Sequence, residues 1–127
     1  MTDIEQNKCN VVAFYELMFN DCQPRLAVEK FVGGEYIQHN QHVTSGKEGF
    51  IRYFEQMATE YPGKHVNIKR VFSEGNHVIL HCHQIWPDGL EYAGIDIFRL
   101  DEAGKVVEHW DVLQELSKTS AHTNGMF

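Results

Sequence analysis

An aspartate in the middle of an apolar segment is the first residue in this sequence that suggests chemistry. In YAGIDIFRL (residues 92–100), the two-residue alternation of a strand places Asp96 on the same face as Tyr92 and Phe98. A carboxylate is costly to bury as an anion, and without a cation nearby burial raises its pKa, so that the neutral acid can donate a hydrogen bond. Asp96 is therefore a candidate acid–base residue, and an exposed position on a solvated face is the alternative.

A second mixed segment follows in VVEHWDVL (residues 106–113). The same alternation puts His109 and Asp111 on one face together with apolar residues, opposite Glu108 and Trp110. Such a mixture is typical of a pocket lining. The edge of a solvated sheet would show it as well.

The segment EYIQHNQH (residues 35–42) concentrates two histidines, an asparagine and two glutamines between apolar stretches. Histidine has an unperturbed pKa of about 6.5, so a neutral imidazole can accept a proton near neutral pH. We expect His39 to face inward, His42 to lie at the surface or rim, and Tyr36 and Ile37 to anchor the segment. A wet surface loop is the alternative.

His81 and His83 form a His-x-His pair on one strand face, which is a spacing that can chelate a metal. Glu91 lies too far along the chain for the cupin metal motif, and helices at the N-terminus do not fit an all-β cupin barrel. We therefore predict no metal site, with polar surface or pocket lining as the expected role. A metal-dependent enzyme using this pair is the less favoured alternative.

These residues must be positioned by helices in the first half of the chain and strands in the second. Apolar spacings of three and four predict a helix over residues 4–20, and Pro24 opens a second over 24–32, which the glycine pair after it should close. Ser45 and Glu48 have the spacing of a capping box and predict a third helix ending before Pro62.

Four segments rich in β-branched and aromatic residues follow, separated by glycine-containing turns. They cover residues 66–75, 77–86, 90–100 and 105–116. Short turns imply hairpins, so the sequence predicts an α+β fold with three N-terminal helices on one face of a mostly antiparallel sheet.

The length of 127 residues indicates a single domain spanning 1–127, with a polar tail (about 117–127) that either frays or docks by its last two residues. A net charge of −7 argues against nucleic acid as a partner, and no basic amphipathic stretch suggests a membrane surface. The N-terminus lacks the apolar core of a secretory signal, and three cysteines without CxxC spacing favour free thiols. The expected location is therefore cytoplasmic.

The order of elements, with YIQHN before the third helix and GIDIFRLDEAGKVVEHWDV at the end of the sheet, resembles the nuclear-transport-factor-two-like superfamily over nearly the whole chain. Within it the sequence is most similar to the SnoaL-like proteins, which are relatives of polyketide cyclases and ketosteroid isomerase. The resemblance implies a cone-like α+β barrel in which a curved sheet wraps a long helix and leaves an apolar cavity. It also implies a homodimer through the convex face of the sheet.

The resemblance assigns roles to three residues. Asp96 matches the acid–base aspartate of the cyclases and the position of the oxyanion-hole aspartate of ketosteroid isomerase. Tyr15 matches the tyrosine of that oxyanion hole. His39 falls where the isomerase carries its general-base aspartate, so that an imidazole replaces a carboxylate. As alternatives, Tyr15 is a core aromatic and His39 braces the cavity rim.

These roles predict a small enzyme that needs no cofactor and acts on a carbonyl compound by enolisation, as an isomerase, cyclase or aldol-type enzyme. Either His39 or Asp96 would be the base. Six further residues are expected to contact the substrate: His83, Trp86, Tyr92, Phe98, His109 and Asp111. A non-catalytic module that binds a small apolar ligand in the same cavity is the alternative.

Overall fold

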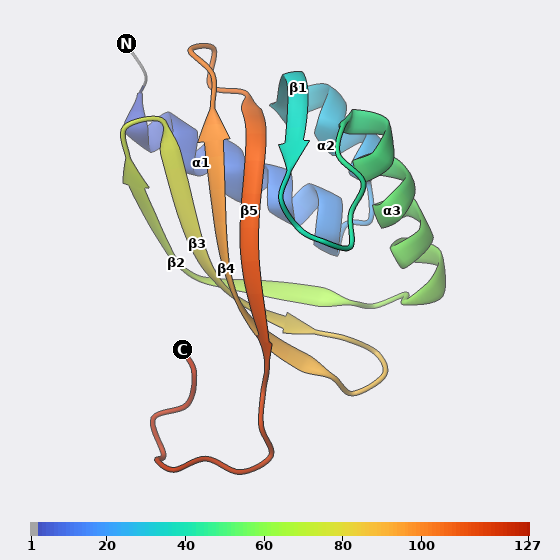
Figure 1. The fold of residues 1–127 in the computed structure, drawn as a ribbon, viewed down its shortest axis with the longest axis vertical. Helices are drawn as coiled ribbons and strands as arrows, with labels where there is room; N and C mark the ends of the chain where they lie inside the picture. Colours follow the sequence, from blue (N-terminus) through green and yellow to red (C-terminus); the bar gives the residue numbers. More distant parts are fainter. Residues whose placement is uncertain (1–2) are drawn as a thin grey trace.

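The chain folds into helices packed on one face of a curved five-stranded sheet, as shown for residues 3–127 by a computed structural model (Figure 1). The helices are α1 (Ile4–Tyr15), which continues into a π-helical segment (Glu16–Asn20), α2 (Pro24–Phe31) and α3 (Lys47–Glu60). The strands are β1 (Val32–Gln38), β2 (His65–Glu74), β3 (His77–Ile85), β4 (Glu91–Leu100) and β5 (Val106–Glu115). The predicted α+β class is confirmed.

The bounds of the first two helices agree with the sequence prediction to within one residue, but the start of the third does not. Pro24 occupies the first turn of α2, where its missing N–H costs nothing. The predicted capping box at Ser45 is wrong, because Gly46 is the N-cap of α3 with a φ of 97° and no side-chain hydrogen bond. The Ser45 hydroxyl instead accepts from the backbone N–H of Gln38 at 3.2 Å.

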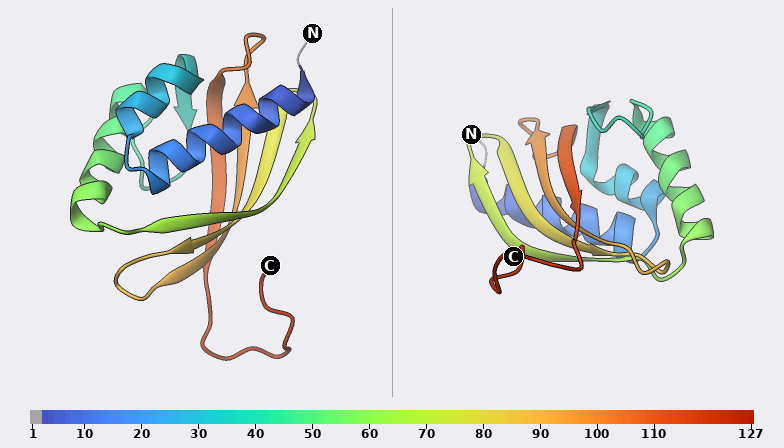
Figure 2. Two further views of the ribbon diagram at one scale, coloured as in Figure 1. Left: turned by 180° about the vertical axis from the view of Figure 1, so that it is seen from behind. Right: turned by 60° about the horizontal axis from the view of Figure 1, so that its bottom comes forward.

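The sheet has the order β1-β5-β4-β3-β2, and β2 to β5 form the predicted antiparallel hairpins. The sequence prediction missed β1, which pairs parallel to β5 and makes the sheet mixed. Gly33 does not end a helix. It allows close packing, since a Cβ there would lie 2.6 Å from Asp101 Oδ2 and 2.9 Å from Val107 Cγ1. The sheet is strongly curved but not closed, with β1 and β2 at its two edges (Figure 2).

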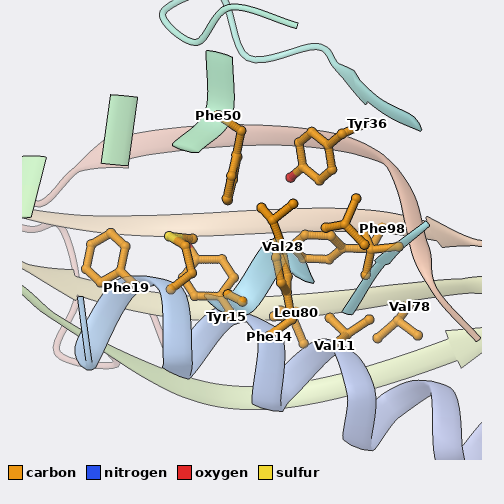
Figure 3. Packing of buried hydrophobic residues seen from close by; sticks show 14 of the residues in the cluster. Val11, Phe14, Tyr15, Phe19, Val28, Tyr36, Phe50, Val78, Leu80 and Phe98 are labelled. Carbon is orange, nitrogen blue, oxygen red and sulfur yellow. The ribbon is translucent and has the colours of Figure 1, made fainter. Parts of the chain in front are cut away.

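The core lies between α1 and the concave face of the sheet. Figure 3 shows Phe14 and Tyr15 of α1 facing the sheet and Tyr36 opposite them. The Phe14 ring lies 6.0 Å from Phe98 in an edge-to-face contact and 5.7 Å from Phe50 in a stacked one. These aromatic contacts fix α1 and β4 relative to one another, and so fix the position of Tyr15 relative to Asp96.

The C-terminal tail leaves β5 as a loop that stands away from the sheet, and its end returns to the outer face (Figure 2). The Phe127 ring stacks on His83 with 4.4 Å between centroids, whereas Met126 is exposed. The apolar docking expected for the last two residues therefore applies to Phe127. Within residues 3–127 no helix is long and apolar enough to span a membrane.

Candidate functional site

A cavity opens at the end of the core between α1, α3 and the concave face of the sheet, and it has two parts. The inner chamber has a volume of about 60 Å³, enough for a few water molecules or one functional group. The outer vestibule has a volume of about 650 Å³. Both parts share six lining residues, so they are continuous: Asn40, Tyr53, Gln84, Trp86, Asp111 and Leu113.

Asp96 and His109 form a buried pair in the inner chamber. Strand register brings them together, because β4 pairs with β5 so that Phe98 lies opposite His109 and Asp96 opposite Asp111. Asp96 Oδ1 lies 2.9 Å from His109 Nε2, and the two residues are 1% and 7% exposed. Asp96 Oδ2 is buried and has no hydrogen-bond partner among the described residues. This oxygen therefore has no hydrogen-bond donor within residues 3–127, and its carboxylate lies near the Cys82 thiol, whose pKa is raised by burial and then by Asp96.

Gln38, at the end of β1, determines which nitrogen of His109 carries a hydrogen. Its Oε1 accepts from the backbone N–H of His39 at 3.1 Å and of Asn40 at 3.0 Å, which identifies this atom as the oxygen. His109 Nδ1 lies 2.7 Å from the same oxygen and must therefore donate to it. One hydrogen is then left to bridge His109 Nε2 and Asp96 Oδ1, so the pair holds a single transferable proton.

Asp111 lies next to this pair, at 3.9 Å from its Oδ2 to His109 Nε2. The Asn40 side-chain amide donates to both carboxylate oxygens of Asp111, at 2.8 and 3.1 Å. The His42 backbone N–H donates to the other end of that amide and fixes its orientation. Burial raises the pKa of Asp111, and the nearby charge of Asp96 adds to this, whereas His109 acts in the opposite direction.

Tyr15 faces the inner chamber from α1. The indole N–H of Trp86 only donates, so its 3.2 Å contact identifies Oε1 of Gln84, and Gln84 Nε2 donates to the Tyr15 oxygen at 3.1 Å. The Tyr15 O–H hydrogen therefore remains free to donate to a ligand. Burial raises the pKa of Tyr15 well above its ordinary value, with the charge of Asp96 the next cause, which keeps the phenol protonated.

Tyr36 is a second phenol in the inner chamber, and the sequence prediction treated it only as an anchor. It is buried against Phe50 and its hydroxyl has no hydrogen-bond partner among the described residues. Burial raises its pKa well above the ordinary value and Asp96 contributes in the same direction, whereas the nearby Gln38 side chain acts in the opposite one. The chamber thus offers two neutral O–H donors.

His39 does not line the inner chamber, although it is one of the residues that line the vestibule. Its Nε2 lies 2.8 Å from Glu108 Oε2, and its ring stacks on Trp110 at 4.9 Å. Both partners lie on the outer face of β5, and the His39 side chain is 42% exposed. The physical reason is strand alternation, since Gln38 points inward and the residue after it must point outward.

Replacing His39 by alanine should therefore change turnover by less than about tenfold, because its hydrogen bond to Glu108 lies outside the inner chamber and a hydrogen bond contributes about 1 kcal/mol. Steady-state kinetics of His39→Ala beside the wild type measures this. A loss comparable to that of an Asp96 variant would show that His39 is the base after all.

The other predicted site residues divide between the two faces of the sheet. Phe98, His109 and Asp111 line the inner chamber, Trp86 lies between the two parts, and Tyr92 lines the vestibule. His83 does not line either part: it lies on the outer face, 2.6 Å from Glu91 Oε1. Its neighbour His81 contacts the Arg70 guanidinium there, so the His81/His83 pair is occupied by other partners.

The sequence of the chain matches a known protein family. A model of the SnoaL-like polyketide cyclase family matches residues 10–120. The chain belongs to this family. No curated protein matches its sequence.

Solved structures agree with SnoaL-like membership at the level of the fold. TsrD from Streptomyces laurentii superposes with a TM-score of 0.74 at 19% identity, covering 89% of this chain and 91% of that one. A candidate ketosteroid isomerase from Kribbella flavida gives a TM-score of 0.74 at 14% identity, with coverage of 96% and 87%. A candidate polyketide cyclase from Bacillus cereus gives 0.73 at 17%, with coverage of 85% and 74%. At such identities the likeness establishes the nuclear-transport-factor-two-like fold alone.

Proposed function

We propose that the chain is an enzyme that removes a proton from the carbon next to a carbonyl group and so forms an enolate. The observation that carries the proposal is the free Oδ2 of buried Asp96, whose other oxygen shares one proton with His109, in the same chamber as the free Tyr15 hydroxyl. SnoaL-like family membership supports an enzyme of this kind.

In this mechanism Asp96 is the base and His39 has no chemical role. With the shared proton on His109, the Asp96 carboxylate accepts the α-proton through Oδ2. The developing enolate oxygen accepts a hydrogen bond from Tyr15, whose hydroxyl is already oriented by Gln84. Asp96 then returns the proton to another carbon in an isomerisation. In a cyclisation the enolate carbon instead attacks a second carbonyl, and the alkoxide that forms takes the proton from Asp96.

The dimensions and charge of the cavity restrict the substrate. Only the reacting group fits into about 60 Å³, so the rest of the molecule must lie in the vestibule of about 650 Å³, a volume typical of small-molecule sites. The vestibule walls include Tyr53, Tyr61, Trp86 and Tyr92. Neither part has a Lys or Arg among its described lining residues, which argues against an anionic substrate.

Solvent deuterium exchange tests the proposal without knowledge of the product. Uncharged ketones containing one to four rings are incubated with the protein in D₂O, in the presence of a chelator, and α-deuteration is followed by NMR. Protein-dependent exchange in at least one ketone is expected. If some of these ketones bind to the protein but none of them exchanges its α-hydrogens, the proposal is contradicted.

A non-catalytic binding module is the second candidate, favoured by the aromatic side chains that line the inner chamber, among them Phe14, Phe50 and Phe98. Mass spectrometry of small molecules that co-purify with the protein separates the two functions. A ligand recovered chemically intact after long incubation favours binding, and conversion of that ligand favours catalysis.

We also propose that the chain forms a homodimer through the outer face of the sheet. Phe72, Ile95 and Val112 are exposed there, with Val112 74% exposed, and adjacent exposed apolar residues often mark an interface. Sedimentation velocity should give a dimer for the wild type and a monomer for Val112→Asp. A monomeric wild type would refute the proposal.

A further inference from the structure

Asp96, His109 and Asp111 form a compact cluster whose geometry resembles that of a metal site. One potential ligand atom from each residue lies within 4.8 Å of the other two. His109 Nε2 is 2.9 Å from Asp96 Oδ1 and 3.9 Å from Asp111 Oδ2. Ligand atoms about 2.0–2.2 Å from one ion are separated by roughly 3–4 Å, so small side-chain movements would complete the site.

The surrounding hydrogen bonds hold these groups in the form that a metal requires. His109 donates its Nδ1 hydrogen to Gln38, so Nε2 is the nitrogen that can present a lone pair to the cluster. Asn40 holds the Asp111 carboxylate from the other side. Metal-ligating imidazoles and carboxylates in proteins are commonly oriented by such outer hydrogen bonds.

The cluster also lacks a compensating positive charge. Two carboxylates lie in the inner chamber, and its described lining residues include no Lys or Arg. Asp96 Oδ2 is fully buried without a hydrogen-bond partner among the described residues, although an unpartnered buried oxygen is costly. A proton can supply the missing charge, and so can a divalent cation.

We propose that Asp96, His109 and Asp111 bind one divalent transition-metal ion of the Zn²⁺ class. The ion replaces the hydrogen between Nε2 and Oδ1, so that one metal ion enters and that proton leaves. One imidazole and two carboxylates suit this class of ion, and positions left open on the ion would face the chamber. The proposal goes beyond enolisation and does not depend on it.

Equilibrium dialysis with Zn²⁺, followed by elemental analysis, tests the proposal on chelator-treated protein without a histidine tag. One ion per chain is expected for the wild type, and calorimetry in buffers of different ionisation enthalpy should show proton release. His109→Gln and Asp111→Asn should lose the ion. Gln38→Ala, which removes only the outer hydrogen bond, should weaken binding by roughly 10- to 100-fold.

His81→Gln and His83→Gln are the matched controls, because these histidines lie on the outer face of the same sheet and should leave Zn²⁺ binding unchanged. Circular dichroism shows whether each variant is folded. If His109→Gln and Asp111→Asn do not fold, the affinity of Gln38→Ala for Zn²⁺ tests the proposal instead. No bound ion, or an ion that survives loss of His109, Asp111 and Gln38, would overturn the proposal. The deuterium-exchange assay contains a chelator, so this failure would leave the proposed enolisation untouched.

Discussion

Replacing Asp96 by asparagine should lower the rate of α-proton exchange by roughly 10²–10⁴-fold, the usual contribution of a positioned acid–base group. Asparagine has nearly the same shape and can still hydrogen-bond to His109 Nε2, so the fold should survive. It cannot accept the α-proton, because its amide oxygen is too weak a base. Exchange rates of Asp96→Asn and wild type, measured by NMR on the same ketone, give the ratio.

The control for this substitution is Asp21→Asn, the same chemical change at an exposed position after the π-helical segment, outside the lining of the cavity. It should exchange protons at the wild-type rate. If a folded Asp96→Asn protein also kept a rate within a few-fold of the wild type, Asp96 would not be the base, and the binding-module interpretation would be favoured.

The inner face of the sheet was predictable because strand alternation is simple geometry. Asp96, His109 and Asp111 were placed on their faces from a period of two, and the antiparallel register of β4 and β5 then brings those faces together. A short glycine turn between the two strands allows little other pairing. The hydrogen bond between Asp96 and His109 depends on that register. The sequence pattern therefore predicted the sheet face of each residue, but not that the two side chains bond to each other.

The position of His39 outside the inner chamber follows from β1. Two glycines after a helix were interpreted as a helix stop, and residues 35–42 as a loop, so alternation was not applied to them. With the strand recognised, buried Tyr36 implies that Gln38 also points inward and that His39 points outward. Parallel pairing of β1 with the distant strand β5 depends on tertiary packing of Gly33 and could not be inferred from local sequence.

The resemblance led to Tyr15, but the residue that orients it was missed. Gln84 lies on the inner face of β3, and from the sequence only His81 and His83 of this strand were considered as functional residues. Its value became apparent only from its two hydrogen bonds, to Trp86 and to Tyr15. A buried glutamine on the apolar face of a strand was the available signal, because such an amide needs partners.

Replacing Tyr15 by phenylalanine should lower kcat by about 10²–10³-fold, corresponding to ~2.7–4 kcal/mol of lost transition-state stabilisation. The ring and its contact with Phe98 at 6.2 Å are kept, so packing changes little. Only the hydrogen bond to the enolate oxygen is removed. Because that charge exists only in the transition state and intermediate, KM should change far less than kcat.

Tyr61→Phe makes the same chemical change in the vestibule, where the rest of the substrate would lie, and should therefore act on KM rather than on kcat. Tyr36→Phe measures whether the second phenol shares the role, and a loss smaller than that of Tyr15→Phe is expected because Gln84 orients Tyr15 alone. If Tyr15→Phe raised KM and left kcat unchanged, Tyr15 would bind the substrate without stabilising the enolate. Tyr36 would then be the remaining candidate for the donor to the enolate oxygen.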